Sequence, residues 1–134
     1  METVKAVVTA RMQVIASYAN RVTMPVWKVE LNQADEKFRK VLKSARHVLV
    51  QNETRITDSM RLRLDAAMEN EAVKTVYEFR QKLQAVWEQA YTSQEQLMQA
   101  LQDWCKEAEA TGIQYLAEFA QRLRGYTLKP AIPL

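Results

Sequence analysis

Residues 27–48 read WKVELNQADEKFRKVLKSARHV, and this stretch decides the fold class. Its apolar side chains alternate gaps of four and three residues over about three heptads, which places them along one side of an α-helix. The opposite side is basic. The stretch therefore predicts an amphipathic helix with a buried apolar side. The apolar positions are Trp27, Leu31, Ala34, Phe38, Val41, Ala45 and Val48, and the basic side carries Lys37, Arg39, Lys40 and Lys43.

The same periodicity recurs along most of the chain. The 134 residues include only 2 glycines and 3 prolines, so few chain reversals and long helices are expected. Pro25 lacks an amide hydrogen, which predicts a break or kink near Met24. The pattern predicts an all-α fold, an antiparallel bundle of five to six helices in a single domain over residues 1–134, with an extended tail over about 127–134. The expected helices cover about residues 3–23, 27–48, 58–68, 71–91, 93–112 and 113–125, and the expected core includes Trp27, Phe38, Phe79, Leu83, Leu101 and Trp104.

Residues that begin and end helices agree with this pattern. Thr57 or Thr54 is placed to cap the third helix. Ser93 and Gln96 have the spacing of a capping box, which predicts a new helix at this point. The last two helices are expected to end at Gly112, in the left-handed conformation, and at Gly125.

The sequence offers no catalytic chemistry of its own. His47 is the only histidine and Cys105 the only cysteine, which leaves no metal-ligand set and no intrachain disulfide. The two glycines occur singly, so no phosphate-cradling loop is formed. His47 is expected at the surface, and Cys105 is expected to be an inert packing residue in a reducing compartment. We therefore expect no catalytic, cofactor-binding or metal-binding residue in this chain.

The sequence also predicts no membrane segment. No apolar run reaches the length of about eighteen residues that a bilayer-spanning helix needs. The N-terminus lacks the uninterrupted apolar stretch of a signal peptide. The expected location is the cytoplasm.

Positive charge is concentrated toward the N-terminal end. The net charge is +3, and residues 1–50 carry nine basic and four acidic side chains. Such an end suits an anionic surface, lipid headgroups or nucleic acid, whereas a solvated helix face is the simpler interpretation. The candidates for contact with nucleic acid are Lys37, Arg39, Lys40, Lys43 and Arg46. No aromatic residues interleave with this basic face and no DNA-binding motif is visible, so the signal for nucleic acid is weak. The candidate contacts with an anionic surface are Lys37, Lys40 and Lys43.

Several stretches resemble the C-terminal end of bacterial acyl-CoA (fatty acid) desaturases. They are residues 100–113 (ALQDWCKEAEATGI), 116–120 (LAEFA), 123–126 (LRGY), 76–87 (VYEFRQKLQAVW) and 3–8 (TVKAVV), the last followed by 16–19 (ASYA) and 25–26 (PV). The resemblance implies a membrane-embedded parent enzyme that holds two irons with histidine boxes and desaturates a fatty acyl chain. Because those boxes are missing here, no catalytic residue of the family can be carried over to this chain.

On this resemblance the chain is a non-catalytic accessory or docking domain of a membrane-bound desaturase. Its expected partners are the desaturase catalytic core or the membrane surface, together with a redox partner, and nucleic acid is not expected. The chain itself would hold no cofactor, because the di-iron centre belongs to the parent enzyme. Attached to that parent, it would lie at the cytoplasmic face of the inner membrane.

A second, weaker resemblance covers about Lys43 to Arg124. The helical part of certain insertion-sequence transposases has a segment ending in Ser-Gly-Ile followed by Phe-Ala-x-x-Leu, and this chain has Thr111-Gly112-Ile113 followed by Phe119-Ala120-x-x-Leu123. It implies a helical segment of a DNA transposase, whose acidic triad is not identified here. A stand-alone protein-interaction bundle is the third alternative. The first forty residues favour the desaturase.

Overall fold

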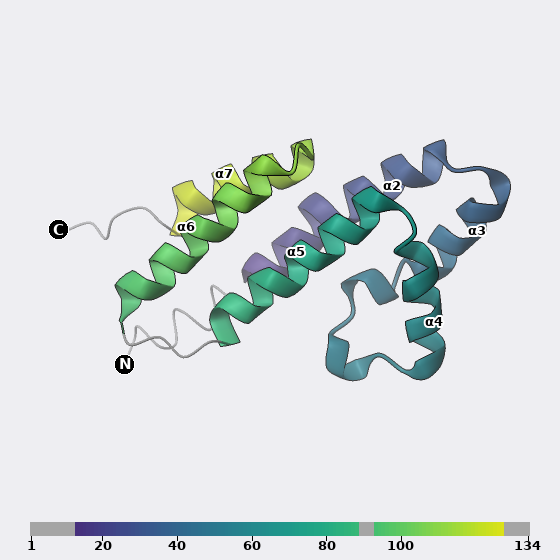
Figure 1. Cartoon of the computed structure of the whole chain (residues 1–134), viewed down its shortest axis with the longest axis horizontal. Coiled ribbons are helices and arrows are strands. Elements are labelled where there is room, and N and C mark those ends of the chain that lie inside the picture. Colours follow the sequence, from purple (N-terminus) through teal and green to yellow (C-terminus); the bar gives the residue numbers. More distant parts are fainter. Residues whose placement is uncertain (1–12, 89–92, 128–134) are drawn as a thin grey trace. The chain divides into compact units, whose positions relative to one another are not determined.

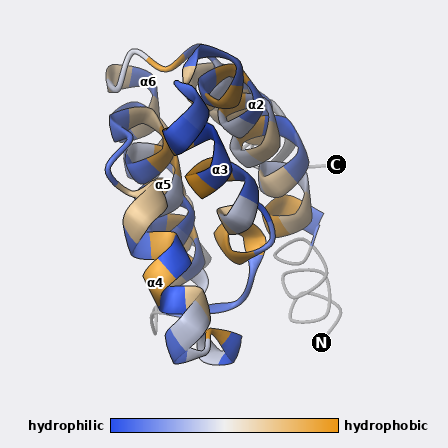
Figure 2. Ribbon diagram, turned by 90° about the vertical axis from the view of Figure 1, so that its right-hand side faces the viewer, coloured by the Kyte–Doolittle hydropathy of each residue, from blue (hydrophilic) through white to orange (hydrophobic). Residues whose placement is uncertain are grey.

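The computed structural model describes residues 13–88 and 93–127 (Figure 1). Every regular element in these two ranges is helical and none is a strand, which confirms the predicted all-α fold. Of the tail expected over about 127–134, residues 128–134 lie outside the described ranges, and so do residues 3–12 of the helix expected over about 3–23. Thr127 itself is helical. Figure 2 shows that the helices carry both hydrophilic and hydrophobic residues, as amphipathic helices do.

The chain divides into two compact units. One comprises Ala19–Glu78 and is called the α2–α4 unit below. The other is formed by the chain on either side of it and is called the α6–α7 unit. Helix α5 (Glu71–Glu88) contributes its first residues to the α2–α4 unit and the rest to the α6–α7 unit. The expectations of a single domain and of an antiparallel order throughout stay predictions.

The α2–α4 unit contains a π-helix at Ala19–Thr23, α2 at Met24–Gln33, α3 at Glu36–Ala45 and α4 at Asp58–Ala67. Two short 3₁₀ turns lie between α3 and α4. They cover Val48–Val50 and Glu53–Arg55.

Pro25 sits in the first turn of α2, directly after the π-helix. Residues 13–33 are helical without a gap, so the proline removes one amide donor inside a helix, and the preceding π-helical turn is a known way of accommodating such a change. The irregularity expected near Met24 is therefore a local change of helix type, and the chain does not leave the helical conformation at this point.

The expectation of one continuous helix over residues 27–48 is wrong. Helix α2 ends at Gln33, and Ala34 adopts an extended conformation with φ −74° and ψ 150°. The carboxylate of Asp35 then accepts a hydrogen bond of 2.8 Å from the backbone amide of Phe38 and caps α3. This local bond satisfies an amide that has no partner within the helix, which makes a new start at Asp35 favourable.

Because of this break, the two halves of the apolar stripe belong to separate helices within one core. The indole Nε1–H of Trp27 on α2 donates a hydrogen bond of 2.7 Å to the carbonyl oxygen of Leu42 on α3. Leu42 and Leu49, which the four-and-three spacing omitted, are fully buried, whereas Trp27 and Phe38 are partly buried. The buried core of this unit is formed by Leu31, Leu42, Ala45, Val48, Leu49, Leu64, Ala67, Val73 and Tyr77.

Two polar side chains cap the N-terminal ends of α4 and α5. Thr57 caps α4, with its hydroxyl accepting from the amide of Met60 at 3.2 Å, which selects Thr57 over Thr54. Asn70 caps α5 by accepting from the amide of Val73 at 2.9 Å. Its side-chain amide also donates to Glu30 of α2 at 2.8 Å, so one residue fixes the start of α5 against α2.

The α6–α7 unit contains helical residues 13–18, part of α5, α6 (Gln94–Ala110) and α7 (Gln114–Thr127). Helices α6 and α7 lie side by side as a hairpin (Figure 1). Ser93 caps α6 by accepting from the amide of Gln96 at 3.2 Å, as predicted. Gly112 turns the chain with φ 79°, in the left-handed region that favours glycine. This conformation confirms its predicted role.

The expectation that the last helix ends at Gly125 is wrong, because α7 continues to Thr127. Glycine inside a helix costs only about 1 kcal/mol relative to alanine, and packing of the helix outweighs that cost. Gly125 therefore lies within a helix, in contrast to Gly112.

Aromatic side chains form the core of the α6–α7 unit. Trp104 is 2% exposed, and its indole Nε1–H donates a hydrogen bond of 3.0 Å to the carbonyl oxygen of Phe79. Its ring contacts those of Phe79, Phe119 and Tyr18 edge to face, with centroids 5.9, 6.0 and 6.2 Å apart. Burial of Phe79, Leu83, Leu101 and Trp104 confirms the core predicted for this part of the chain.

No helix in the described part of the chain is long and apolar enough to cross a membrane, in agreement with the sequence.

Candidate nucleic-acid interface

The described residues contain no group of three histidine, cysteine or acidic side chains placed to hold a metal ion. His47 is exposed in the turn after α3, which confirms its expected surface position. The expected lack of catalytic, cofactor-binding and metal-binding residues stays a prediction.

Cys105 is fully buried, and its Sγ lies 3.6 Å from the carbonyl oxygen of Ala120 on α7. Burial raises the pKa of the thiol from 9.0 to about 11, with Arg124 lowering it and Glu109 raising it to lesser extents. The thiol is therefore protonated at neutral pH, and since the thiolate is the reactive form, Cys105 is a packing residue rather than a nucleophile.

The strongest concentration of charge lies on α3. Five basic side chains, called the basic strip, lie within ten residues and are all exposed. Nearby Asp35 is occupied as the cap of α3, which leaves Glu36 as the remaining acidic side chain on the helix. The basic strip consists of Lys37, Arg39, Lys40, Lys43 and Arg46.

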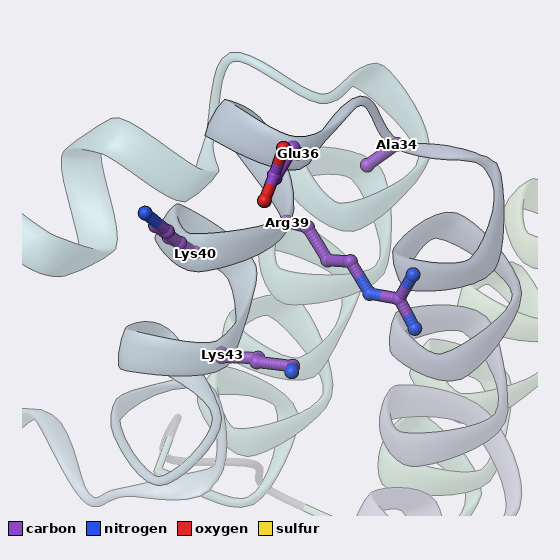
Figure 3. Close-up of a pocket in the computed structure, with 5 residues that line it drawn as sticks. All are labelled: Ala34, Glu36, Arg39, Lys40 and Lys43. Carbon is purple, nitrogen blue, oxygen red and sulfur yellow. The ribbon is translucent and has the colours of Figure 1, made fainter.

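An open hollow with a volume of about 460 Å³ lies along the strip. Figure 3 shows Arg39 and Lys43 extending to one side of α3 and Lys40 to the other, with Glu36 between them. Their i, i+3, i+4, i+7 spacing places the backbone positions along one stripe of the helix, from which the side chains of Lys40 and of Arg39 and Lys43 diverge. The lining residues are Ala34, Glu36, Arg39, Lys40 and Lys43.

Two of the three lysines selected from the sequence thus share one hollow, Lys40 and Lys43. Lys37 is exposed on α3 but does not line the hollow. Glu36 was overlooked as a member of the site, although its helical spacing to Arg39, Lys40 and Lys43 was already visible in the sequence. The structure therefore adds one carboxylate to the basic side chains that the sequence placed together.

Some cations of the described residues are held in ion pairs. Arg124 pairs with Glu109 at 2.8 Å, and further ion pairs join Lys82 to Glu107 and Arg61 to Glu53. Over residues 13–88 and 93–127, no ion pair involves a side chain of the basic strip. These cations are therefore available to an external anion.

Arg46 is held at the end of the strip by an aromatic ring. Its guanidinium carbon lies 5.5 Å from the centroid of the Trp27 ring. Attraction between the cation and the ring face favours this position. The same indole is hydrogen-bonded to the carbonyl oxygen of Leu42 on α3. Trp27 therefore contacts both α3 and Arg46, the residue that directly follows α3.

Comparison with known proteins points to transposases. Residues 6–129 match the ISL3 family, described as transposase. A transposase for insertion sequence element IS1001 from Bordetella parapertussis is 34% identical over 116 residues, which are 84% of this chain and 28% of the relative. The chain thus spans about 28% of the length of that relative. No solved structure matches.

These matches overturn the desaturase resemblance. Residues 100–113 and 76–87, on which it rested, lie inside the region that matches the transposase family. Amphipathic helices share a spacing of apolar, acidic and basic residues whatever their function, so short helical stretches are poor markers of a family. The resemblance to insertion-sequence transposases was the correct one.

The partners derived from the desaturase are corrected as well. A desaturase core, a membrane surface and a redox partner were expected, and nucleic acid was not; the match to transposases contradicts these expectations. The di-iron centre was implied only by the same resemblance. Since the match covers residues 6–129, the chain belongs to the ISL3 family of transposases.

Proposed function

We propose that this chain is a helical segment of an insertion-sequence transposase and that it helps to hold the DNA on which that enzyme acts. The family membership and the IS1001 relative support the enzyme class. We place the protein in the cytoplasm, where it would meet its DNA.

The main observation in favour of DNA binding is the basic strip of α3. Its five cations are exposed, and none of them forms an ion pair with a carboxylate of the described ranges. DNA is a dense polyanion, and proteins bind it largely by neutralising phosphates and releasing condensed counterions. A row of unpaired lysine and arginine side chains is suited to this task.

Binding of the whole chain to a labelled 20-base-pair duplex, followed by fluorescence anisotropy, tests the proposal. With three to five phosphate contacts, raising the salt from 50 to 200 mM should weaken binding about 40- to 500-fold. Flotation with vesicles of neutral lipid and of mixed neutral and anionic lipid measures the competing interaction with membranes. We expect duplex binding to be the tighter. Failure to bind duplex at 50 mM salt, or tighter binding to anionic vesicles, would contradict the proposal.

A further inference from the structure

The aromatic rings near the basic strip are not free to stack on bases. Phe38 is partly buried against the core of the α2–α4 unit. Trp27 is covered by the guanidinium of Arg46, and its Nε1–H is bonded to the carbonyl of Leu42. Proteins that bind single strands stack successive bases on exposed aromatic side chains. The surface of α3 offers no such platform, which favours duplex DNA.

The strip lacks the side chains that recognise adenine. Asparagine and glutamine recognise adenine in the major groove, and α3 contains neither. Its one serine, Ser44, donates its hydroxyl hydrogen bond to the carbonyl of Val41 at 2.8 Å. What remains is a set of long cationic side chains, which suit phosphates at any sequence.

Glu36 is the exception within the hollow. It is exposed, it lines the same hollow as Arg39, Lys40 and Lys43, and it forms no ion pair within the described part of the chain. A carboxylate at this place repels a phosphate that approaches the cations. It also lies in the first turn of α3, where negative charge is favourable to the helix.

We propose that α3 grips double-stranded DNA by its phosphate backbone through Arg39, Lys40 and Lys43, and that Glu36 weakens this grip. The inference rests on the proposed function and adds the form of DNA, the mode of contact and a residue that sets the affinity. A weaker grip shortens each stay on non-specific DNA, which a protein that searches along DNA requires.

Charge reversal at Lys40 and Lys43 tests the grip. The variant K40E/K43E and the neutral variant K40Q/K43Q are compared with the wild-type chain on two 20-base-pair duplexes of unrelated sequence and on a single strand of the same length. Circular dichroism confirms that each variant is folded, which is expected since both lysines are exposed. Wild type should bind the two duplexes within about threefold of each other and the single strand more weakly. Both variants should bind duplex at least about tenfold more weakly, and the slope of log affinity against log salt should fall by about 2.

The matched control is K106E/R122E, which makes the same change of charge at two exposed residues of the α6–α7 unit. Its loss of affinity should be much smaller than that of K40E/K43E. Equal losses in the two charge-reversal variants, or preference for the single strand, would overturn the proposal while leaving DNA binding intact. A wild-type chain that binds neither form of DNA would instead overturn the proposed function.

Glu36 is tested separately with E36Q, which should bind duplex about threefold more tightly because one repulsive charge several ångströms from the phosphates is removed. The control E95Q removes the corresponding first-turn carboxylate of α6 and should leave affinity unchanged. Equal affinities of E36Q and wild type would overturn the role given to Glu36.

Discussion

Replacement of Trp104 by phenylalanine probes the core of the α6–α7 unit at its best-defined point. Trp104 is 2% exposed and lies among three other aromatic rings. Its Nε1–H donates to the carbonyl oxygen of Phe79 across helices α6 and α5 at 3.0 Å. Phenylalanine keeps an aromatic ring at this place but removes the donor and part of the volume.

The expected loss of stability has two parts. Loss of a buried neutral hydrogen bond costs about 1 kcal/mol. A residual cavity of about 40 Å³ adds about 1 kcal/mol at roughly 24 cal/mol per Å³. The free energy of unfolding of W104F should therefore fall by about 2 kcal/mol, and the midpoint of urea unfolding by about 1 M.

Urea unfolding is followed by circular dichroism at the helical band rather than by tryptophan fluorescence, because the substitution removes a fluorophore. The matched control is W87F, which makes the same replacement at a half-buried tryptophan of α5. W87F should lower the free energy of unfolding by less than about half the amount expected for W104F, because Trp87 is less buried and its replacement leaves a smaller cavity.

A loss below about 0.5 kcal/mol for W104F, or equal losses for W104F and W87F, would refute this reasoning. The small loss would mean that the hydrogen bond to Phe79 and the packing around the indole contribute little stability, and equal losses would mean that the deeper burial of Trp104 adds nothing to the cost.

Leu83→Ala and Leu101→Ala should each lower the free energy of unfolding by about 2–5 kcal/mol in denaturant melts, because both side chains are buried; a change under half a kilocalorie would mean that they face solvent. Gly112→Ala should destabilise the chain by about 1 kcal/mol because φ is 79°, whereas Gly125→Ala should stabilise it by about 0.5–1 kcal/mol because the glycine is helical and a Cβ would meet no atom within 4 Å. Opposite signs in thermal melts are expected, and equal signs would contradict the assignment. Cys105 should react with a thiol reagent at pH 8 only after denaturation. Burial raises the pKa of this thiol from 9.0 to about 11, so its contribution to the free energy of unfolding is present below pH 9 and is lost between pH 9 and pH 11. Fast labelling of the folded chain would contradict the burial on which both expectations depend.

Local features of the fold followed from the sequence because each depends on a few neighbouring residues. The hydroxyls of Thr57 and Ser93 bond amides three residues on, and Gly112 adopts the backbone conformation that other residues avoid. The core residues Leu83 and Leu101 followed from helical periodicity alone.

Two predictions of helix boundaries were wrong because competing local preferences favoured different structures. The four-and-three stripe favoured a single helix through Ala34, yet the capping carboxylate of Asp35 and the gain from packing α2 against α3 favoured a break. The break then buried Leu42, whose carbonyl oxygen binds Trp27. In the same way, the glycine signal at Gly125 was outweighed by a helix that continues to Thr127.

The sequence predicted part of the candidate site. Charge and helical spacing placed Arg39, Lys40 and Lys43 on one side of a helix, but Glu36 was not included with them. Similarity of short helical stretches also led to the wrong enzyme family, and only the match over residues 6–129 corrected it.

By itself, the sequence determined that the chain is helical, where most helices begin and that positive charge gathers near the N-terminal end, because periodicity, capping and charge are local properties. Only the tertiary structure decided that the stripe over residues 27–48 bends into two helices and that the cations of α3 are left without ion-pair partners within the described ranges. Those outcomes depend on which distant side chains share a core. A break in a helix is favourable only when the free energy of burying Leu31 and Leu42 together exceeds that of the helical hydrogen bonds it removes.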